Sequence, residues 1–387
     1  MSVRAFSQGG AVERGDYVEP AGDRRSAARV PLRALVLGGG GILGAAYEIG
    51  ALAALEERRG SGSIYRDFDI FVGTSAGAFV AALLAQGIAA RDLFDGFRSG
   101  GDLSLDQRDV YRIDWKRFLG GARSLAAGLA RSVVEELRRG RRPSLVRLFL
   151  RAQDLLPAGF IRLDGLEVAL CRMFARRGVS NRFADLNKAL FVPALDIERT
   201  ERIVFGEPEE SEPTICQAVA ASCALPRFFG PVRVGRRLLV DGAIGGSVNV
   251  DIALEKGATH VLVINPIVPL CSGSDGSRGS DHCRSMSKAG LGQVLDQCLK
   301  IEHDAGLRSA LEVAHMRSPE ATLLLLEPSR RAMFSEGPMD YDARARVLDL
   351  GYSATALKLA GAAALFDGFF GNPALCEGHM RRTSPTR

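Results

Sequence analysis

The chain has 387 residues, of which 47% are hydrophobic and 25% are charged, and its formal net charge is +5. This composition is typical of a globular protein and supplies enough apolar side chains for a sizeable hydrophobic core. The length allows one large α/β domain with additions, or two domains. The positive charge suits an anionic surface, but it is too small to choose between a membrane and a nucleic acid.

The cysteines and the apolar segments indicate the cellular compartment. Seven cysteines are scattered along the chain without a C-x-x-C pair, which favours free thiols in a reducing compartment over a disulfide framework or a zinc site. The first thirty residues lack the apolar core of a secretory signal, and no apolar run approaches the roughly 18–20 residues that span a bilayer. We therefore expect a cytoplasmic protein that can meet membranes at their surface.

The N-terminal part of the chain alternates strands and helices. Residues 1–31 are polar and predict a disordered arm. A strand at 33–37 runs into a glycine-rich turn and a helix, and a second strand at 68–72 runs into a helix at 78–84. This β-α-β-α order predicts a mostly parallel sheet with helices on its faces.

The following segment, about residues 92–183, is mainly helical and strongly basic, so we interpret it as an insertion beside the sheet. It contains a cluster of four arginines, which we call the arginine cluster: Arg138, Arg139, Arg141 and Arg142. A basic amphipathic surface of this kind can contact anionic lipid, although the same residues also fit a solvated helix end.

Strands then resume, and they complete a predicted catalytic domain over residues 32–270. The expected elements are strands at 190–196 and 201–205, a helix at 215–222, strands at 232–234 and 237–241, and an inner strand at 259–265. Residues 271–387 predict a loop followed by a C-terminal α/β extension with a helix at 291–316, a strand at 321–326 and helices to about 370.

The glycine run after the first strand allows two interpretations. Gly39, Gly40, Gly41 and Gly44 match the G-x-G-x-x-G pattern of a dinucleotide loop. That fold also needs an acidic residue at the end of the next strand, where this chain has Ser75 instead. Alternatively, the unpaired N–H groups of consecutive glycines at a helix start can stabilise an oxyanion.

Ser75 lies between Gly73 and Gly77, at the junction of a strand and a helix. A G-x-S-x-G sequence in this position is typical of a nucleophile elbow, because the tight turn excludes side chains on either side of the serine. Two adjacent parallel strands would bring the glycine run and Ser75 to the same edge of the sheet. This arrangement favours the oxyanion interpretation of the glycine run.

A catalytic serine needs a base, and the five histidines are poorly located for that role. None follows an acidic residue in the order that α/β-hydrolases use, which leaves His260 and His303 as secondary candidates. Asp241 is the stronger candidate, since it ends a strand and is followed by the small residues Gly242 and Ala243. A dry site would give its carboxylate the basicity that an alcohol requires.

Taken in order, the glycine run, the serine elbow and the Asp241-Gly242-Ala243 segment resemble the patatin-like phospholipases, over about residues 32–266. The resemblance implies a three-layer α/β/α sandwich and a lipid acyl hydrolase with a Ser–Asp dyad that needs no metal or other cofactor. It assigns Ser75 as the nucleophile and Asp241 as the base. The oxyanion hole falls on the backbone amides around Gly39, Gly40 and Gly41.

The resemblance has two departures, and it leaves other functions open. Many relatives carry Arg or Lys where this chain has Leu43, and the spacing from Gly44 to Gly50 is one residue longer than in many members. Both affect the expected headgroup preference more than the reaction. A soluble carboxylesterase or thioesterase on the same dyad is one alternative, and a non-catalytic lipid- or nucleotide-binding module is another. We expect a lipid or membrane surface, not a nucleic acid, as the partner; the oligomeric state stays open.

Overall fold

The computed structural model describes residues 3–5 and 31–370, with gaps at 61, 101, 104, 111, 114, 141, 143, 145, 149–158, 160, 227, 247, 271–285 and 329–336. Most of the predicted arm and of the predicted loop after residue 270 lie outside the described residues, as do Arg141, His282 and His379.

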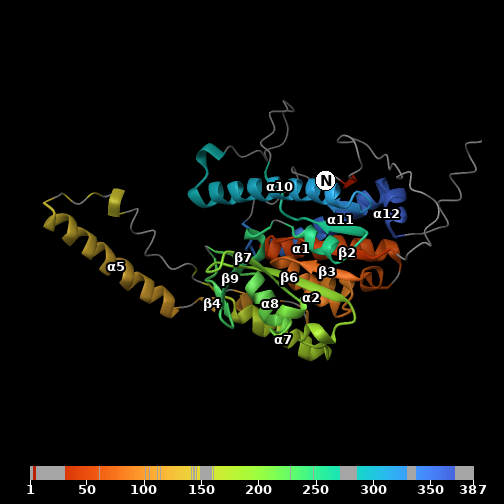
Figure 1. The fold of residues 1–387 in the computed structure, drawn as a ribbon, viewed down its shortest axis with the longest axis horizontal. Coiled ribbons are helices and arrows are strands. Elements are labelled where there is room, and N and C mark those ends of the chain that lie inside the picture. The colour runs from red at the N-terminus through yellow and green to blue at the C-terminus, as the bar shows by residue number, and fades with distance from the viewer. Residues whose placement is uncertain are drawn as a thin grey trace, which may run out of the picture.

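A nine-stranded sheet forms the centre of the molecule (Figure 1). Its order is β1-β11-β10-β2-β3-β6-β9-β8, and β7 pairs with β6 beside that path. The inner strands β11, β10, β2, β3 and β6 are parallel, as predicted, whereas β1, β7, β8 and β9 pair antiparallel with their neighbours. The bounds are β1 Val3–Ala5, β2 Arg33–Leu37, β3 Ile70–Gly73, β6 Ala189–Asp196, β7 Glu201–Phe205, β8 Val232–Val234, β9 Arg237–Asp241, β10 His260–Ile264 and β11 Thr322–Leu326.

Helices cover both faces of this sheet, because side chains of the inner strands alternate between two apolar cores. In β2, Leu35 and Leu37 enter the core on one face, and Ala34 and Val36 enter the core on the other. The first core is completed by α1 (Gly41–Arg59), α2 (Ala76–Ala85), α8 (Ile215–Ser222) and α11 (Arg344–Gly361), and the second by α9 (Val250–Glu255) and α10 (Leu291–Arg317). The predicted three-layer α/β/α sandwich is confirmed.

The C-terminal segment is packed into this sandwich at two places. Strand β11 joins the sheet beside β10, and α11 lies directly against α1. The helices approach closely because a Cβ atom at Gly351 would overlap with the carbonyl oxygen of Tyr47, and one at Gly50 with that of Leu348. This contact fixes the helix that begins at the glycine run.

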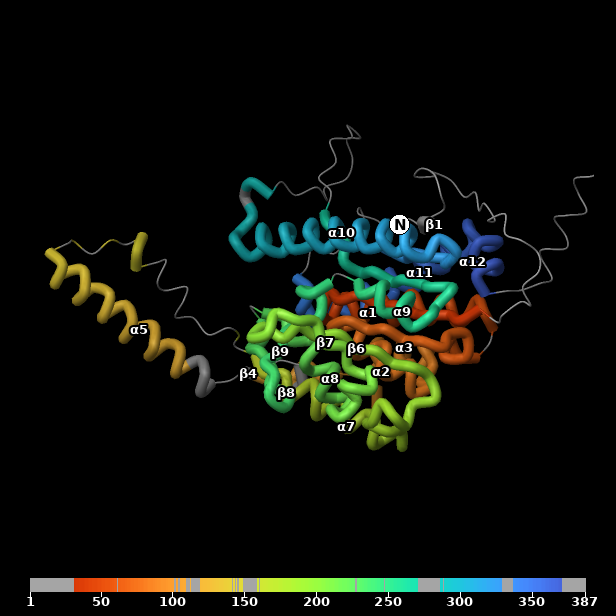
Figure 2. The backbone as a smooth tube through the Cα atoms, viewed as in Figure 1, coloured from red at the N-terminus to blue at the C-terminus, as the bar shows by residue number. Residues whose placement is uncertain are grey.

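The predicted helical insertion contains α3 (Ala90–Ser99), α4 (Gln107–Val110), α5 (Trp115–Arg138) and α7 (Asp164–Arg177), with a small ribbon of β4 (Arg112–Ile113) and β5 (Ile161–Arg162). Helix α5 projects away from the body of the molecule, as Figure 2 shows. Its last turn leads into the arginine cluster, of which Arg138, Arg139 and Arg142 are exposed. Among the described helices, including α12 (Ala363–Phe370), none has the length and hydrophobicity to cross a bilayer.

Candidate active site

The serine elbow has the strained geometry that its sequence predicts. Ser75 separates β3 from α2 and has φ 56° and ψ −122°, in a region that side-chain-bearing residues rarely adopt. A Cβ atom at Gly73 would overlap with the carbonyl oxygen of Gly77, and one at Gly77 with that of Gly38. Both flanking positions therefore require glycine, and the turn directs the Ser75 hydroxyl away from the sheet.

Asp241 lies 166 positions after Ser75 in the chain, and the topology of the sheet brings the two residues together. The first residues of β6 pair with β3, and its last residues pair with β9 running in the opposite direction. Strand β9 therefore returns toward the end of β3, where Asp241 is its last residue. A Cβ atom at the next position, Gly242, would overlap with the carbonyl oxygen of Pro193, so this turn also requires glycine.

The Ser75 hydroxyl donates a hydrogen bond of 2.6 Å to Oδ2 of Asp241. The other carboxylate oxygen, Oδ1, accepts from the backbone N–H of Ala243 at 2.9 Å. Asp241 is 1% exposed, and burial raises its pKa to about 6 although both hydrogen bonds act to lower it. The carboxylate is thus ionised at neutral pH and more basic than a solvated aspartate.

The glycine run curves past the serine between β2 and α1. A Cβ atom at Gly39 would lie 3.3 Å from Cβ of Ser75, and Gly40 and Gly41 have φ values of 131° and 63°. Among the described backbone acceptors, none takes the N–H groups of Gly39, Gly40 or Gly41. These amides are also close to the positive end of α1, which begins at Gly41, so the loop favours a negatively charged oxygen.

Further residues support the elbow, and the sequence analysis did not identify them. The Ser75 N–H donates to Oγ of Ser222 at 2.9 Å, and the Cys223 thiol donates to the Ser75 carbonyl oxygen at 3.1 Å. Thr74 accepts a hydrogen bond from Nδ2 of Asn249 at 2.9 Å. Burial raises the pKa of Cys223 well above its usual value, so this thiol stays protonated. Ser222, the last residue of α8, and Cys223 directly after it therefore hold the backbone N–H and carbonyl groups of Ser75.

A cavity of about 490 Å³ opens above these groups. The glycine run, Ser75 and Asp241 line it, and most of its other lining residues are apolar. The apolar lining includes Phe79, Leu105, Leu163, Leu166, Leu225, Phe229, Ile244, Ile267, Leu299 and Met339. The charged residues Asp251, Asp296, Lys300 and Glu302 also line it. A mainly apolar cavity with a few polar groups is the common form of a ligand site.

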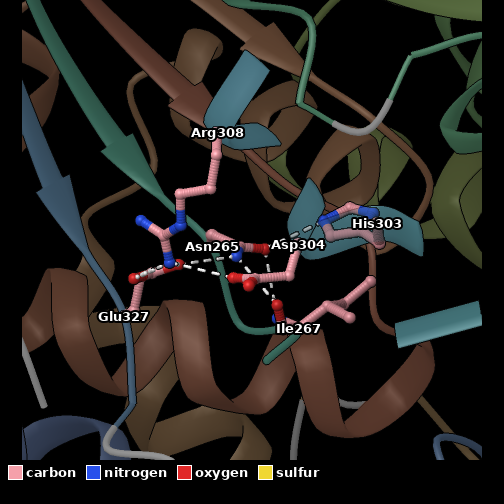
Figure 3. Close-up of polar contacts among 6 residues, drawn as sticks. All are labelled: Asn265, Ile267, His303, Asp304, Arg308 and Glu327. Carbon is pink, nitrogen blue, oxygen red and sulfur yellow. Dashed lines mark hydrogen bonds and ion pairs between the residues drawn. The ribbon is translucent and has the colours of Figure 1, made fainter. Parts of the chain in front are cut away.

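Behind the glycine run, Asn265 holds the turn after β10 in place (Figure 3). Its Nδ2 donates to the Ile267 carbonyl oxygen at 2.8 Å, and its Oδ1 accepts from the Ile267 N–H at 3.2 Å. Pro266 lies 3.3 Å from the position of a Cβ atom at Gly40, and Ile267 lies 3.8 Å from that at Gly39. The turn therefore packs directly against the loop that carries the unpaired amides.

Asn265 belongs to a buried polar network that joins α10 to the sheet (Figure 3). Its Nδ2 also donates to Glu327 at 3.0 Å, and Glu327 is held by Arg308 at 2.8 Å. His303 Nε2 lies 3.1 Å from Oδ1 of Asn265 and must carry the proton, since that oxygen can only accept. Burial lowers the pKa of His303 to about 4, so its ring is neutral at pH 7.

The two histidines that were secondary candidates for the base thus make contacts with groups other than Ser75. His303 lines the cavity, but its Nε2 proton is donated to Asn265. His260 begins β10 opposite Arg33, at the end of the sheet away from Ser75, where its ring contacts Phe369. Leu43 is buried in the core of the first face, and its N–H donates to the Pro338 carbonyl oxygen.

Comparison with solved structures gives several distant similarities. VipD from Legionella pneumophila matches at 18% identity with a TM-score of 0.38, covering 86% of this chain and 67% of that protein. ExoU of Pseudomonas aeruginosa, in its complex with SpcU, matches at 18% identity and a TM-score of 0.31, covering 87% of this chain and 52% of that one. The human GIVD cytosolic phospholipase A2 matches at 13% identity and a TM-score of 0.36, with coverages of 88% and 60%.

Comparison with protein families assigns the chain. The model of the patatin-like phospholipases matches residues 35–254, which are more than half of the chain and include the glycine run, the serine elbow and Asp241. With this match and the three-layer fold, the chain belongs to the patatin-like phospholipase family of lipid ester hydrolases.

Proposed function

We propose that the protein is a serine lipid acyl hydrolase of the phospholipase A or lysophospholipase type, with Ser75 as nucleophile and Asp241 as base. The observation that carries this proposal is the 2.6 Å hydrogen bond from the Ser75 hydroxyl to a buried carboxylate, at the base of an apolar cavity. A nucleophile within hydrogen-bond reach of its base is the geometry that acyl transfer requires.

In the first half of the reaction, Oγ of Ser75 attacks the ester carbonyl carbon and its proton passes to Oδ2 of Asp241. The carbonyl oxygen becomes an oxyanion, for which the N–H groups of Gly39, Gly40 and Gly41 are the donors. Removing one such donor typically costs about 2.7–4 kcal/mol of transition-state stabilisation. The intermediate then collapses, and the alcohol leaves with the proton that Asp241 carries, so that Ser75 remains acylated.

In the second half, water attacks the acyl-Ser75 carbonyl carbon and gives its proton to Asp241. Collapse of the second tetrahedral intermediate releases the fatty acid, and Ser75 recovers its proton from Asp241. One aspartate serves as base and then as acid in each half. Its pKa of about 6 suits both tasks, because a carboxylate with a pKa near the operating pH is largely ionised and is still a stronger base than a solvated aspartate.

The cavity favours a lipid over a small polar ester. Its apolar lining would bury the hydrocarbon of an acyl chain, and burial of each CH₂ group contributes about 0.8 kcal/mol. A soluble carboxylesterase or thioesterase on the same dyad, and a non-catalytic lipid- or nucleotide-binding module, are the alternatives to be tested.

The test is hydrolysis by the purified protein of phosphatidylcholine vesicles, of lysophosphatidylcholine and of a short-chain nitrophenyl ester. We expect release of fatty acid from the lipids by the wild type and none by Ser75→Ala. Hydrolysis of the short ester alone would favour the soluble esterase. A folded wild type that hydrolyses none of the three would exclude a catalytic role.

We also propose that the enzyme acts in the cytoplasm, at membrane surfaces, and that the arginine cluster contacts anionic lipid. Arg138, the last residue of the projecting helix α5, is exposed, as are Arg139 and Arg142 after it, although Arg139 is also paired with Glu135. Replacing all four arginines with glutamate should abolish the salt-sensitive part of binding to phosphatidylserine vesicles in co-sedimentation. Unchanged binding would refute this contact.

A further inference from the structure

The N-terminal half of α10 has its polar side turned toward the protein and its apolar side toward solvent. Over residues 291–301, six residues at helical spacing form one face of the helix. We call this set the apolar face: Leu291, Val294, Leu295, Cys298, Leu299 and Ile301. The exposed fractions of its five large hydrophobic residues range from 37% for Val294 to 72% for Leu291. A surface helix in a globular protein normally has the opposite orientation.

The polar side of the same turns makes the contacts that fix this orientation. Gln297 donates to the Leu270 carbonyl oxygen at 2.8 Å and accepts from the Leu270 N–H at 3.1 Å. Lys300 is paired with Asp296 at 2.8 Å, and its side chain is only 11% exposed. Because the Gln297 amide is satisfied by Leu270, rotating the helix to bury the apolar face would leave that amide without these partners. The Lys300–Asp296 pair lies within the helix, on the side that lines the cavity.

The apolar face leads to the mouth of the catalytic cavity. Leu299 belongs to the face and also lines the cavity, and Ile244, only three residues after Asp241, lines it as well. Both are more than half exposed. The mouth of the cavity is therefore bordered by exposed aliphatic side chains that come from two different parts of the chain, one of which continues along α10. Figure 1 shows α10 along the top of the molecule, with its N-terminal end at the left.

We propose that the apolar face of α10 inserts into the surface of a lipid bilayer or lipid aggregate, and so brings the cavity mouth against the layer that holds the substrate. This inference rests on the proposed function. A bilayer is the occupant that continuity favours, because one surface would cover the apolar face and supply acyl chains to the cavity beside it. The apolar face carries no charge, so its contact differs in kind from that of the arginine cluster.

The test uses a Leu291→Ser/Leu295→Ser double variant, since neither residue lines the cavity. Its matched control is Val313→Ser/Met316→Ser, which removes two exposed apolar side chains from the other end of α10. Binding to phosphatidylcholine vesicles is measured by flotation, so that anionic lipid plays no part. Hydrolysis is followed on the same vesicles and on a monomeric short-chain ester.

The double variant should bind vesicles at least tenfold more weakly and hydrolyse them correspondingly more slowly, while its rate on the monomeric ester stays within twofold of wild type. The control variant should match wild type throughout. Equal vesicle binding by wild type and double variant overturns the inference. So does a wild-type dimer in light scattering that the double variant converts to a monomer, since the face would then contact a second copy. A wild type that hydrolyses neither substrate instead refutes the proposed function.

Discussion

The hydroxyl of Ser75 and the carboxylate of Asp241 are joined by a 2.6 Å hydrogen bond in a site where Asp241 is almost fully buried. The carboxylate has two acceptor oxygens and uses one for Ser75 and the other for Ala243. An amide has only one acceptor oxygen and cannot take up a proton at neutral pH. The proposed role of Asp241 as a base can therefore be separated from its role in the structure.

We predict that Asp241→Asn lowers kcat by at least a thousandfold without loss of stability at pH 8. Burial raises the pKa of the carboxyl from 3.8 to about 6, so above pH 6 the native state bears a cost on the order of 3 kcal/mol for an ionised Asp241. Asparagine is uncharged and avoids that cost. This gain in stability offsets the loss of one of the two hydrogen bonds that the carboxylate accepts. Turnover and thermal unfolding check this; near-normal turnover would mean that another group is the base.

The pH dependence of the reaction should report the same carboxylate. Asp241 accepts the Ser75 proton only when ionised, and burial raises its pKa to about 6. On the acid side, kcat/KM should therefore fall about tenfold per pH unit below pH 6, and it should be constant between about pH 7 and 8. A neutral soluble ester is the appropriate substrate. A rate independent of pH between 4.5 and 8 would contradict the assignment.

Gly39→Ala should damage catalysis more than the fold. The added methyl group would lie 3.3 Å from Cβ of Ser75 and displace the loop from the position where its amides face the oxyanion. We expect kcat to fall by about a hundredfold, in the range for loss of one oxyanion donor. Gly361→Ala is the matched control, because nothing lies within 4 Å of its added methyl group and it is the last residue of α11. If both variants keep wild-type turnover, the glycine loop does not donate the hydrogen bonds that stabilise the oxyanion.

Asn265 should influence turnover through the turn that supports the glycine run. Asn265→Ala removes both hydrogen bonds to Ile267, so we expect kcat to fall about tenfold with KM changed less than twofold. His303→Gln keeps a donor for Asn265 and should retain more than a fifth of the wild-type kcat. Steady-state kinetics of the folded variants check both values. A thousandfold loss in His303→Gln would indicate that His303 is the base after all.

Local sequence was sufficient to predict the elements that form the candidate site. Glycines on both sides of Ser75, a strand before it and a helix after it determine the elbow, and the small residues after Asp241 mark a second tight turn. The alternation of strands and helices was sufficient to predict that the strands at the centre of the sheet are parallel. These features depend on neighbouring residues and on the handedness and packing rules of α/β units, which a sequence displays directly.

The contacts that support the site could not be predicted, because they join residues far apart in the chain. Ser222 and Asn249 lie 147 and 175 positions from their partners in the elbow. Asn265 had one signal, a polar side chain directly after the apolar strand β10, but its partners on α10 and β11 had none. Periodicity predicted α10 as a helix, yet it could not indicate that the apolar side of its first turns faces solvent.

The most direct test of the central claim is covalent labelling of the folded protein with a fluorophosphonate, which reacts preferentially with an activated serine. The probe should modify the wild type at Ser75, with one label per chain identified by peptide mass spectrometry. Labelling should disappear in Ser75→Ala and slow strongly in Asp241→Asn. A folded wild type that stays unlabelled, or a label on another serine, would contradict the assignment of Ser75 as the nucleophile.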